Sequence, residues 1–266
     1  VETFKYPFTT DTTPTLAHIQ EQAARCLDCG VPGCREACPL TNRIPDWLQA
    51  VARGDIQRAA DIAHATNPLP EVCGRLCPQH RLCEGACTRA TQDGAVTIGA
   101  IEQYLGDTAL VRGWHPAAPA RRTGKKIAII GAGPAGLACA DSLNRTGNTV
   151  TVYDRGAGIG GLLATGVPPF KLEKQVLAER QALWEQAGIG FRLGTPVDGA
   201  MLRGLIAEHD AVFLGSGAQT TRAVELKGQR LAGVYQALDY LNAMNAGRHT
   251  QLKDRRVVVL GSGDTA

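Results

Sequence analysis

The sequence has few aromatic residues, little net charge and no long apolar run. Aromatic residues make up 5% of the 266 residues, and the formal net charge is +3. Uncharged stretches such as residues 127–140 are short and broken by glycine and proline, so no membrane-spanning helix is predicted. The start, Val1 to Lys5, lacks the charged and then apolar order of a signal peptide. Because the basic residues form no run either, we predict neither a nucleic-acid partner nor a membrane partner.

Glycine and cysteine, by contrast, are plentiful and unevenly distributed. Eight of the nine cysteines lie between Cys26 and Cys87, and the ninth, Cys139, is predicted to be a small buried packing residue. A stretch rich in proline, alanine and basic residues, 114–126, follows the cysteine-rich segment and is typical of a linker. Beyond it, short β-branched runs alternate with glycine-rich turns and amphipathic stretches, which predicts a parallel α/β sheet.

The eight clustered cysteines form two closely spaced runs. The first contains Cys26, Cys29, Cys34 and Cys38, and the second contains Cys73, Cys77, Cys83 and Cys87. A disulfide framework is typical of small secreted chains, and structural zinc usually takes short-spaced ligand pairs separated by a longer gap. Iron–sulfur ligation fits best, because Pro39 follows the fourth cysteine as in two-cluster ferredoxins, where that cysteine ligates the other cluster.

This crossed arrangement predicts two metal centres. The first would be held by Cys26, Cys29, Cys34 and Cys87. The second would be held by Cys38, Cys77 and Cys83, with one position that Cys73 could fill to give two all-cysteine sites. The residues between the runs, 44–65, carry apolar side chains at helical spacing, which predicts helix.

A dinucleotide-binding pattern begins after the linker. A β-branched strand, Lys126–Ile130, leads into Gly131, Gly133 and Gly136, then into a small-residue helix and a second strand that ends at Asp154. In this order the glycines permit a tight turn, backbone approach to a pyrophosphate, and close packing of helix on strand. The helix N-terminus favours phosphate groups, and the acid would accept hydrogen bonds from a ribose.

A second copy of this pattern begins near the end of the sequence. A predicted strand, Arg256–Leu260, is followed by Gly261 and Gly263, and Ala266 occupies the third small position. Two such motifs suggest a flavoprotein with separate sites for FAD and a nicotinamide nucleotide, of which the second is incomplete in this chain. We hypothesise a truncated product, or a reading frame that ends at a recoded stop codon. Sequencing the transcript beyond Ala266 would test the recoding.

Together these motifs resemble those of the small-subunit family of NADPH-dependent glutamate synthase and of the related flavin and iron–sulfur half of dihydropyrimidine dehydrogenase. The shared stretches include R-C-L-D-C-G-V-P-G-C, N-P-L-P-E-V-C-G-R-L-C-P, I-G-A-G-P-A-G-L, G-G-L-L-A-T-G-V-P-P-F-K-L and G-S-G-D-T-A. The resemblance implies an α/β protein in which a helical domain with two 4Fe–4S clusters spans 1–120. A Rossmann-like FAD-binding domain would span 121–250, and the start of a truncated NAD(P)H-binding domain would span 251–266.

The resemblance also assigns individual residues. One cluster would be held by Cys26, Cys29, Cys34 and Cys87. The other would be held by Cys38, Cys77, Cys83 and Glu102, with Gln103 as the competing ligand and Cys73 as a spare cysteine. The FAD site would comprise Gly131, Gly133, Pro134, Ala135, Gly136, Asp154, Arg155, Gly161, Leu162 and Gly217. The incomplete NAD(P)H site would contain Gly261 and Gly263.

The function that the resemblance implies is electron transfer without a catalytic acid, base or nucleophile. NADPH would reduce FAD, and electrons would leave through the clusters to a glutamate synthase large subunit that makes glutamate from glutamine and 2-oxoglutarate. Alternatives on the same architecture are a pyrimidine reductase subunit and a ferredoxin:NADP reductase subunit. A different alternative is a non-catalytic electron-transfer or zinc-binding fragment. We expect a cytoplasmic protein, with little NADPH oxidation by this chain alone.

Overall fold

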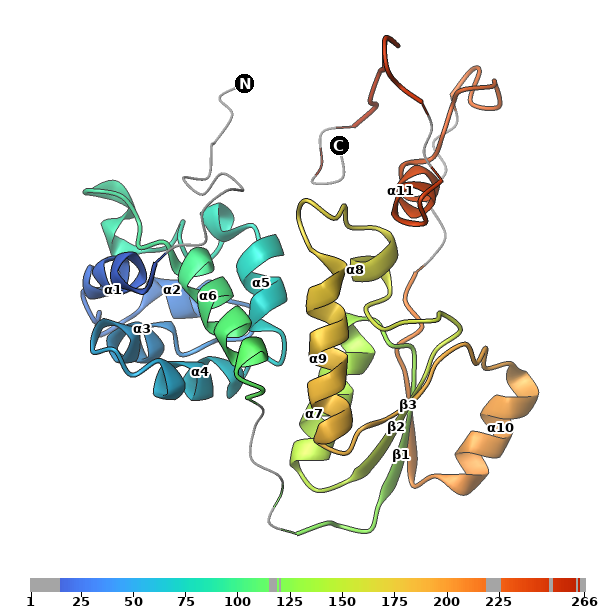
Figure 1. Cartoon of the computed structure of the whole chain (residues 1–266), viewed down its shortest axis with the longest axis horizontal. Coiled ribbons are helices and arrows are strands. Elements are labelled where there is room, and N and C mark those ends of the chain that lie inside the picture. Colours follow the sequence, from blue (N-terminus) through green and yellow to red (C-terminus); the bar gives the residue numbers. More distant parts are fainter. Residues whose placement is uncertain are drawn as a thin grey trace. The chain divides into compact units, whose positions relative to one another are not determined.

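The computed structural model describes residues 15–114, 119, 121–218, 226–248, 251–261 and 263. The chain divides into two compact units, Val1–Ala118 and Pro119–Ala266. Helices make up the first unit, whereas the second is built around a sheet (Figure 1). The linker expected over 114–126 falls partly on residues 115–118 and 120, which lie outside the described residues.

The first unit is a set of short helices around one apolar core. The α-helices are α1 (Leu16–Ala24), α2 (Gly33–Glu36), α3 (Ile44–Ala52), α4 (Ile56–His64), α5 (Pro70–Leu76) and α6 (Ile98–Val111), with 3-10 turns η1 (Gln79–Arg81) and η2 (Thr88–Thr91). Trp47, Leu48 and Ile101 are buried at its centre, and Cys34 and Cys83 are buried in the same cluster. The cysteine-bearing loops are therefore anchored on a packed helical core.

The helix predicted over 44–65 forms, but as two helices, because the chain bends between α3 and α4. Gly54 adopts a φ of +82°, a left-handed conformation that glycine takes at little cost. The Asp55 side chain then accepts a 3.0 Å hydrogen bond from the Arg58 amide and begins α4 as its N-cap. Apolar spacing does not reveal this break, because Val51 and Ile56 on its two sides are buried in the same core.

The second unit has a four-stranded parallel sheet, as the alternating pattern predicts. Its strands are β1 (Lys126–Ile130), β2 (Thr149–Tyr153), β3 (Gly190–Arg192) and β4 (Ala211–Leu214), in the order β3-β2-β1-β4. Its helices are α7 (Pro134–Arg145), α8 (Leu162–Thr165), α9 (Lys174–Gln186), α10 (Gly199–Glu208) and α11 (Ala237–Asn245). Helices α7 and α9 lie on one face of the sheet and α10 on the other (Figure 1). This is the doubly wound, Rossmann-like arrangement.

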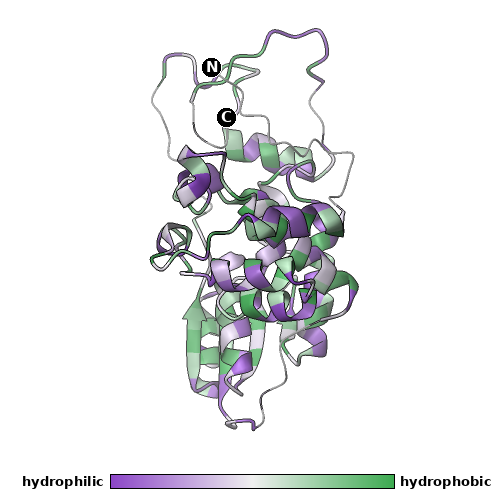
Figure 2. Cartoon of the chain, turned by 90° about the vertical axis from the view of Figure 1, so that its left-hand side faces the viewer, coloured by the Kyte–Doolittle hydropathy of each residue, from purple (hydrophilic) through white to green (hydrophobic). Residues whose placement is uncertain are grey.

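The position of β1 in the sheet explains why the strand of the dinucleotide-binding motif could be predicted from the sequence. β1 pairs with both β2 and β4, so that Ile127 lies opposite Val150 and Ala211. Ala128 and Ile129 are fully buried, and Figure 2 colours the strands mainly as hydrophobic. A strand covered on both faces carries a continuous apolar run, which is the pattern in this segment.

Two expectations for this unit are wrong. The strand expected over 256–260 does not form, and Val258 and Leu260 in this stretch are about four-fifths exposed, at 81% and 76%. A strand needs a neighbour for its backbone hydrogen bonds, and the described sheet provides none here. Cys139 is partly exposed on α7 rather than buried. In the described part of the chain, no helix has the length and apolar character needed to cross a bilayer.

Candidate functional site

Four cysteines from distant parts of the sequence line one pocket in the first unit. Cys26 and Cys29 follow α1, Cys34 lies on α2, and Cys87 immediately precedes η2. The pocket has about 370 Å³ of space, part of it open to solvent, and its remaining wall includes Leu48 and other apolar side chains. This is the set that the crossed arrangement predicts for the first centre.

Close backbone packing brings the two cysteine runs together. A Cβ atom at Gly33 would overlap the carbonyl of Ala86, so the turn that carries Cys34 approaches the turn before Cys87 as only glycine allows. In the same pocket, Cys29 Sγ lies 3.3 Å from Thr88 Oγ1, in hydrogen-bond contact. The spacing of the two runs predicts which cysteines share a centre. It does not predict the contact between Cys29 and Thr88.

The thiols of this group oppose one another's ionisation. Burial raises the pKa of Cys34 to about 11, with further contributions from the charges of Cys26, Cys87 and Cys29. Burial also raises the pKa of Cys26, and Cys29 and Cys87 add to that effect. A bound centre of positive charge would offset this repulsion and favour the thiolates, so the donor set suits an iron–sulfur group.

Two arginines that the sequence analysis did not single out connect the segments around the pocket by hydrogen bonds. Arg25 donates to the carbonyls of Gly94 at 2.6 Å and Ala95 at 3.2 Å, and so ties the end of α1 to the loop after η2. Arg89 lines the pocket, donates to the Arg25 carbonyl at 3.2 Å and pairs with Asp93. Little in their local sequence marks these roles, because apart from the side chains of Gln22 and Asp93 their partners are backbone carbonyls distant in sequence.

A second group gathers around the loops on either side of η1. Cys38 follows α2, Cys77 ends α5, Cys83 follows η1 and Glu102 lies on α6. Burial raises the pKa of Cys83, and negative charges on Glu84, Glu102 and Cys38 raise it further. Burial raises the pKa of Glu102 to about 8, with a contribution from Cys77. The structure thus places Cys83 within electrostatic reach of Cys38 and Glu102, and Glu102 within reach of Cys77.

Cys73 and Asn67 adjoin this second group. The Cys73 thiol hydrogen-bonds to Cys77, which raises the pKa of Cys73 and lowers that of Cys77 to about 7. Cys73 Sγ also lies 3.6 Å from Asn67 Oδ1, and Asn67 Nδ2 donates to Glu102 Oε1 at 2.9 Å. The buried Asn67 was not singled out from the sequence. Its only local signal is its place in the N-P-L-P stretch.

Glycines hold the two helices that carry these residues close together. Cβ atoms at Gly74 on α5 and at Gly106 on α6 would overlap the backbone of Gln103 and Glu71 respectively. The α5 and α6 backbones therefore approach so closely that no Cβ atom fits at either glycine, and this packing helps to set the position of Cys77 relative to Glu102.

Gly74→Ala is expected to destabilise the first unit by about 1–3 kcal/mol, the usual cost of forcing an added carbon into a packed interface. The added Cβ would meet backbone rather than a flexible side chain, so α5 and α6 must separate. Urea unfolding followed by circular dichroism measures the loss. Gly30→Ala is the control, because a Cβ there meets nothing within 4 Å. Equal midpoints for the two variants would contradict the packing argument.

In the second unit, three glycine-rich turns meet at the carboxyl ends of the strands. A Cβ at Gly131, which has a φ of +106°, would overlap the carbonyl of Gly215 after β4. A Cβ at Gly161, which has a φ of +53°, would lie 3.0 Å from the Cα of Gly133. These turns follow β1, β2 and β4, so they surround the point at which the strand order reverses, where ligands of such sheets bind.

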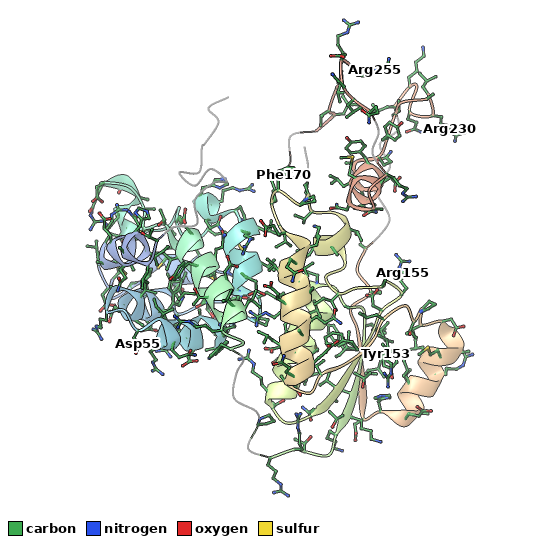
Figure 3. The ribbon with its side chains drawn as sticks, in the orientation of Figure 1. Asp55, Tyr153, Arg155, Phe170, Arg230 and Arg255 are labelled. Atoms are coloured by element: carbon green, nitrogen blue, oxygen red, sulfur yellow. The ribbon has the colours of Figure 1, made fainter. Side chains whose placement is uncertain are left out.

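The remaining residues predicted for FAD lie around these turns. Pro134 and Ala135 are exposed in the first turn of α7, and Leu162 begins α8. Figure 3 shows the exposed Arg155 beyond Tyr153, at the carboxyl end of β2. Gly217, with a φ of +70°, follows β4.

Asp154 has a structural task that the sequence analysis did not foresee. Its carboxylate accepts hydrogen bonds from the amides of Ala132 at 2.7 Å and Gly156 at 2.6 Å, which fixes the glycine-rich turn to the end of β2. Lys174 is a further unforeseen residue, since its ammonium donates to the carbonyls of Leu163 at 2.7 Å and Val167 at 2.5 Å. It thereby holds α8 and the following turn in place.

Some predicted residues are not brought together. Gly261 and Gly263 lie in irregular backbone, and a Cβ at either would meet nothing within 4 Å. Ala266 lies outside the described residues. Within the described ranges, no three His, Cys, Asp or Glu side chains converge tightly enough to hold a single metal ion. The four pocket cysteines instead surround a space.

Comparisons with known proteins agree with both units. Residues 7–114 match the family described as dihydropyrimidine dehydrogenase domain II, 4Fe-4S cluster, and residues 125–266 match the pyridine nucleotide-disulphide oxidoreductases. The NADPH glutamate synthase small chains of Halomonas elongata and Escherichia coli K12 are 50% and 49% identical to the chain. Each alignment covers 92% of this chain and 54% of the relative, so the chain spans about half the relatives' length. AegA of Escherichia coli K12, named only as an oxidoreductase, is 47% identical over 93% of this chain and 40% of its own.

Proposed function

The chain belongs to the pyridine nucleotide-disulphide oxidoreductase family, and on that premise we propose that it is part of an electron-transfer subunit carrying FAD and two 4Fe–4S clusters. The observation that carries this proposal is the pocket in the first unit. Four thiols from two runs that are separate in sequence line a single space, which is the arrangement that a shared cluster requires.

The residues of the second unit suit a dinucleotide. The turn from Gly131 to Gly136 brings backbone close to a pyrophosphate, and the N-terminus of α7 provides amide hydrogens and the positive end of a helix dipole. Asp154 and Lys174 keep the surrounding turns in place through the hydrogen bonds described above. We propose Gly131, Gly133, Pro134, Ala135, Gly136, Asp154, Arg155, Gly161, Leu162 and Gly217 as the FAD-binding residues.

The first unit would bind the clusters and set their properties. We propose Cys26, Cys29, Cys34 and Cys87 for one and Cys38, Cys77, Cys83 and Glu102 for the other. When bound, such clusters accept and release single electrons, and their potential follows the ligand type, burial and hydrogen bonding around them. The chain's part is to hold thiolates in apolar surroundings, and no acid, base or nucleophile is needed from it.

For the complete protein, we propose that NADPH is the electron donor and that the acceptor is a glutamate synthase large subunit, which makes glutamate from glutamine and 2-oxoglutarate. The two small chains that are about half identical to this sequence support that acceptor. AegA, which is nearly as similar, is named only as an oxidoreductase. A different electron-accepting partner is therefore the second candidate for the acceptor. Gly261 and Gly263 remain our proposal for the NADPH-binding turn.

The test is oxygen-free purification of the chain with iron, acid-labile sulfide, zinc and flavin measured together. We expect about eight irons and about eight sulfides per chain, four of each for each cluster, and no zinc. Zinc in stoichiometric amount without labile sulfide would overturn the proposal in favour of a structural metal domain. A colourless preparation with neither iron nor flavin would also overturn it.

A further inference from the structure

We propose that Asn67 decides which side chain completes the second cluster: it positions Glu102 as the ligand and holds the Cys73 thiol away as an unused alternative. This inference rests on the proposed function, because it concerns the same cluster. The geometry that carries it is a single buried amide between the two competing side chains.

The orientation of the Asn67 amide is set by the backbone. Its Oδ1 accepts a 3.0 Å hydrogen bond from the Leu69 amide, two residues along the chain at the start of α5. Because an N–H cannot be satisfied by an NH₂ group, Oδ1 must face Leu69 and Nδ2 must point the other way. Asn67 is only 1% exposed, so water cannot compete for either end.

That orientation gives Asn67 opposite effects on its two neighbours. Nδ2 donates to Glu102 Oε1 at 2.9 Å, so one carboxylate oxygen is held and the carboxylate's rotation is restricted. Oδ1 also lies 3.6 Å from Cys73 Sγ and competes with Cys77 for the single hydrogen of the Cys73 thiol. Cys73 lies only one helical turn before the proposed ligand Cys77, so without this contact it is close enough to compete.

The sequence therefore carries two candidates for one ligand position, and one amide distinguishes them. Outer hydrogen bonds of this kind orient metal ligands, and their loss typically costs about 10–100-fold in metal affinity or activity. Asn67 touches no cluster itself, so it is a positioning residue, and its role must be tested by a property of the cluster.

Asn67→Asp is the informative variant, because it keeps the size of the side chain and the oxygen that accepts from Leu69. The replaced NH₂ group becomes an oxygen facing the Glu102 carboxylate, which it repels instead of holding. In the oxygen-free full chain we expect iron and sulfide to be retained, while the midpoint potential and the electron paramagnetic resonance signal of one cluster shift, because Cys73 replaces Glu102.

The companion variants make the assignment specific. Cys73→Ala alone should leave both signals as in the wild type, whereas the double variant Asn67→Asp, Cys73→Ala should lose one cluster, about half the iron. Asn144→Asp is the control for placing an acid at a buried asparagine, since Asn144 is also buried but lies in the second unit. It should leave both cluster signals unchanged.

Two results would overturn the inference while leaving the proposed function intact. One is an Asn67→Asp protein whose two signals and potentials equal those of the wild type. The other is an equal loss of iron in the single and the double variant, which would mean that Asn67 only supports the fold. Wild-type protein without labile sulfide would instead overturn the proposed function, and this inference with it.

Discussion

Cys87→Ala is expected to remove one of two clusters and so to halve the iron content, from about eight irons per chain to about four. Cys87 lines the same pocket as Cys26, Cys29 and Cys34, although it lies in the other cysteine run. Removal of one thiolate from a four-thiolate site leaves an iron without its protein ligand, and alanine supplies no replacement oxygen.

Because each proposed cluster takes ligands from both cysteine runs, we also predict which variants lose the same electron paramagnetic resonance signal. The resonance signal lost in Cys87→Ala should be the one lost in Cys29→Ala, although these residues are far apart in sequence. It should differ from the signal lost in Cys83→Ala, although Cys83 is only four residues from Cys87. Spectra of the three variants, reduced without oxygen, decide the assignment. If Cys87→Ala and Cys83→Ala lose the same signal, each run holds its own cluster and the pocket has been misinterpreted.

Cys139→Ala is the matched control for this series. Cys139 lies on α7 in the second unit and is partly exposed, so it has the same chemistry as the ligands without their surroundings. Iron, sulfide and both signals should remain at wild-type values. Circular dichroism of all variants shows whether a lost cluster reflects a missing ligand or an unfolded domain.

The sequence predicts the cysteine sets because their spacing and order carry the information. Short spacings keep Cys26, Cys29 and Cys34 on neighbouring turns, and Pro39 after the fourth cysteine indicates that the runs exchange a ligand. The contacts that hold the runs together are not predictable in this way. Arg25, for example, donates to carbonyls about seventy residues away, and backbone carbonyls leave no mark in the sequence.

Local patterns predict strands well only where the fold provides neighbours. The segment from Lys126 to Ile130 forms the predicted strand because β2 and β4 pair with it on both sides. The similar segment from Arg256 to Leu260 is just as β-branched, yet it forms no strand in the described sheet. Likewise, helical spacing continues across Gly54, where the backbone turns, because burial and not helix continuity sets that spacing.

Sequence spacing alone does not decide whether Glu102, Gln103 or Cys73 is the fourth ligand of the second cluster, since the first two are adjacent on α6. The distinguishing information is the hydrogen bond from Asn67 to Glu102, which joins residues 35 apart. It depends on the close approach of α5 and α6, which in turn depends on Gly74 and Gly106. Tertiary packing therefore supports Glu102 as the proposed ligand.

Gly133→Ala is expected to weaken FAD binding by about tenfold or more, equivalent to roughly 1.4 kcal/mol, while leaving the fold as stable as the wild type. Gly133 has a φ of −78° and a ψ of 177°, which any residue can adopt, and a Cβ there would meet nothing within 4 Å. The protein itself therefore does not need glycine at this position. Only a group that approaches the turn from outside, such as a pyrophosphate, would clash with the added methyl group.

This separation of binding from stability distinguishes Gly133 from its neighbour in the motif. A Cβ at Gly136 would overlap the carbonyl of Gly131, so Gly136→Ala should lower the unfolding midpoint and flavin binding together. Gly158→Ala, which also adds a methyl group into open space but outside the motif, should change neither. Flavin fluorescence titration and urea unfolding on the three variants provide the comparison. A Gly133→Ala protein that binds FAD like the wild type would mean that the pyrophosphate does not lie against this turn, and the proposed FAD site would have to move.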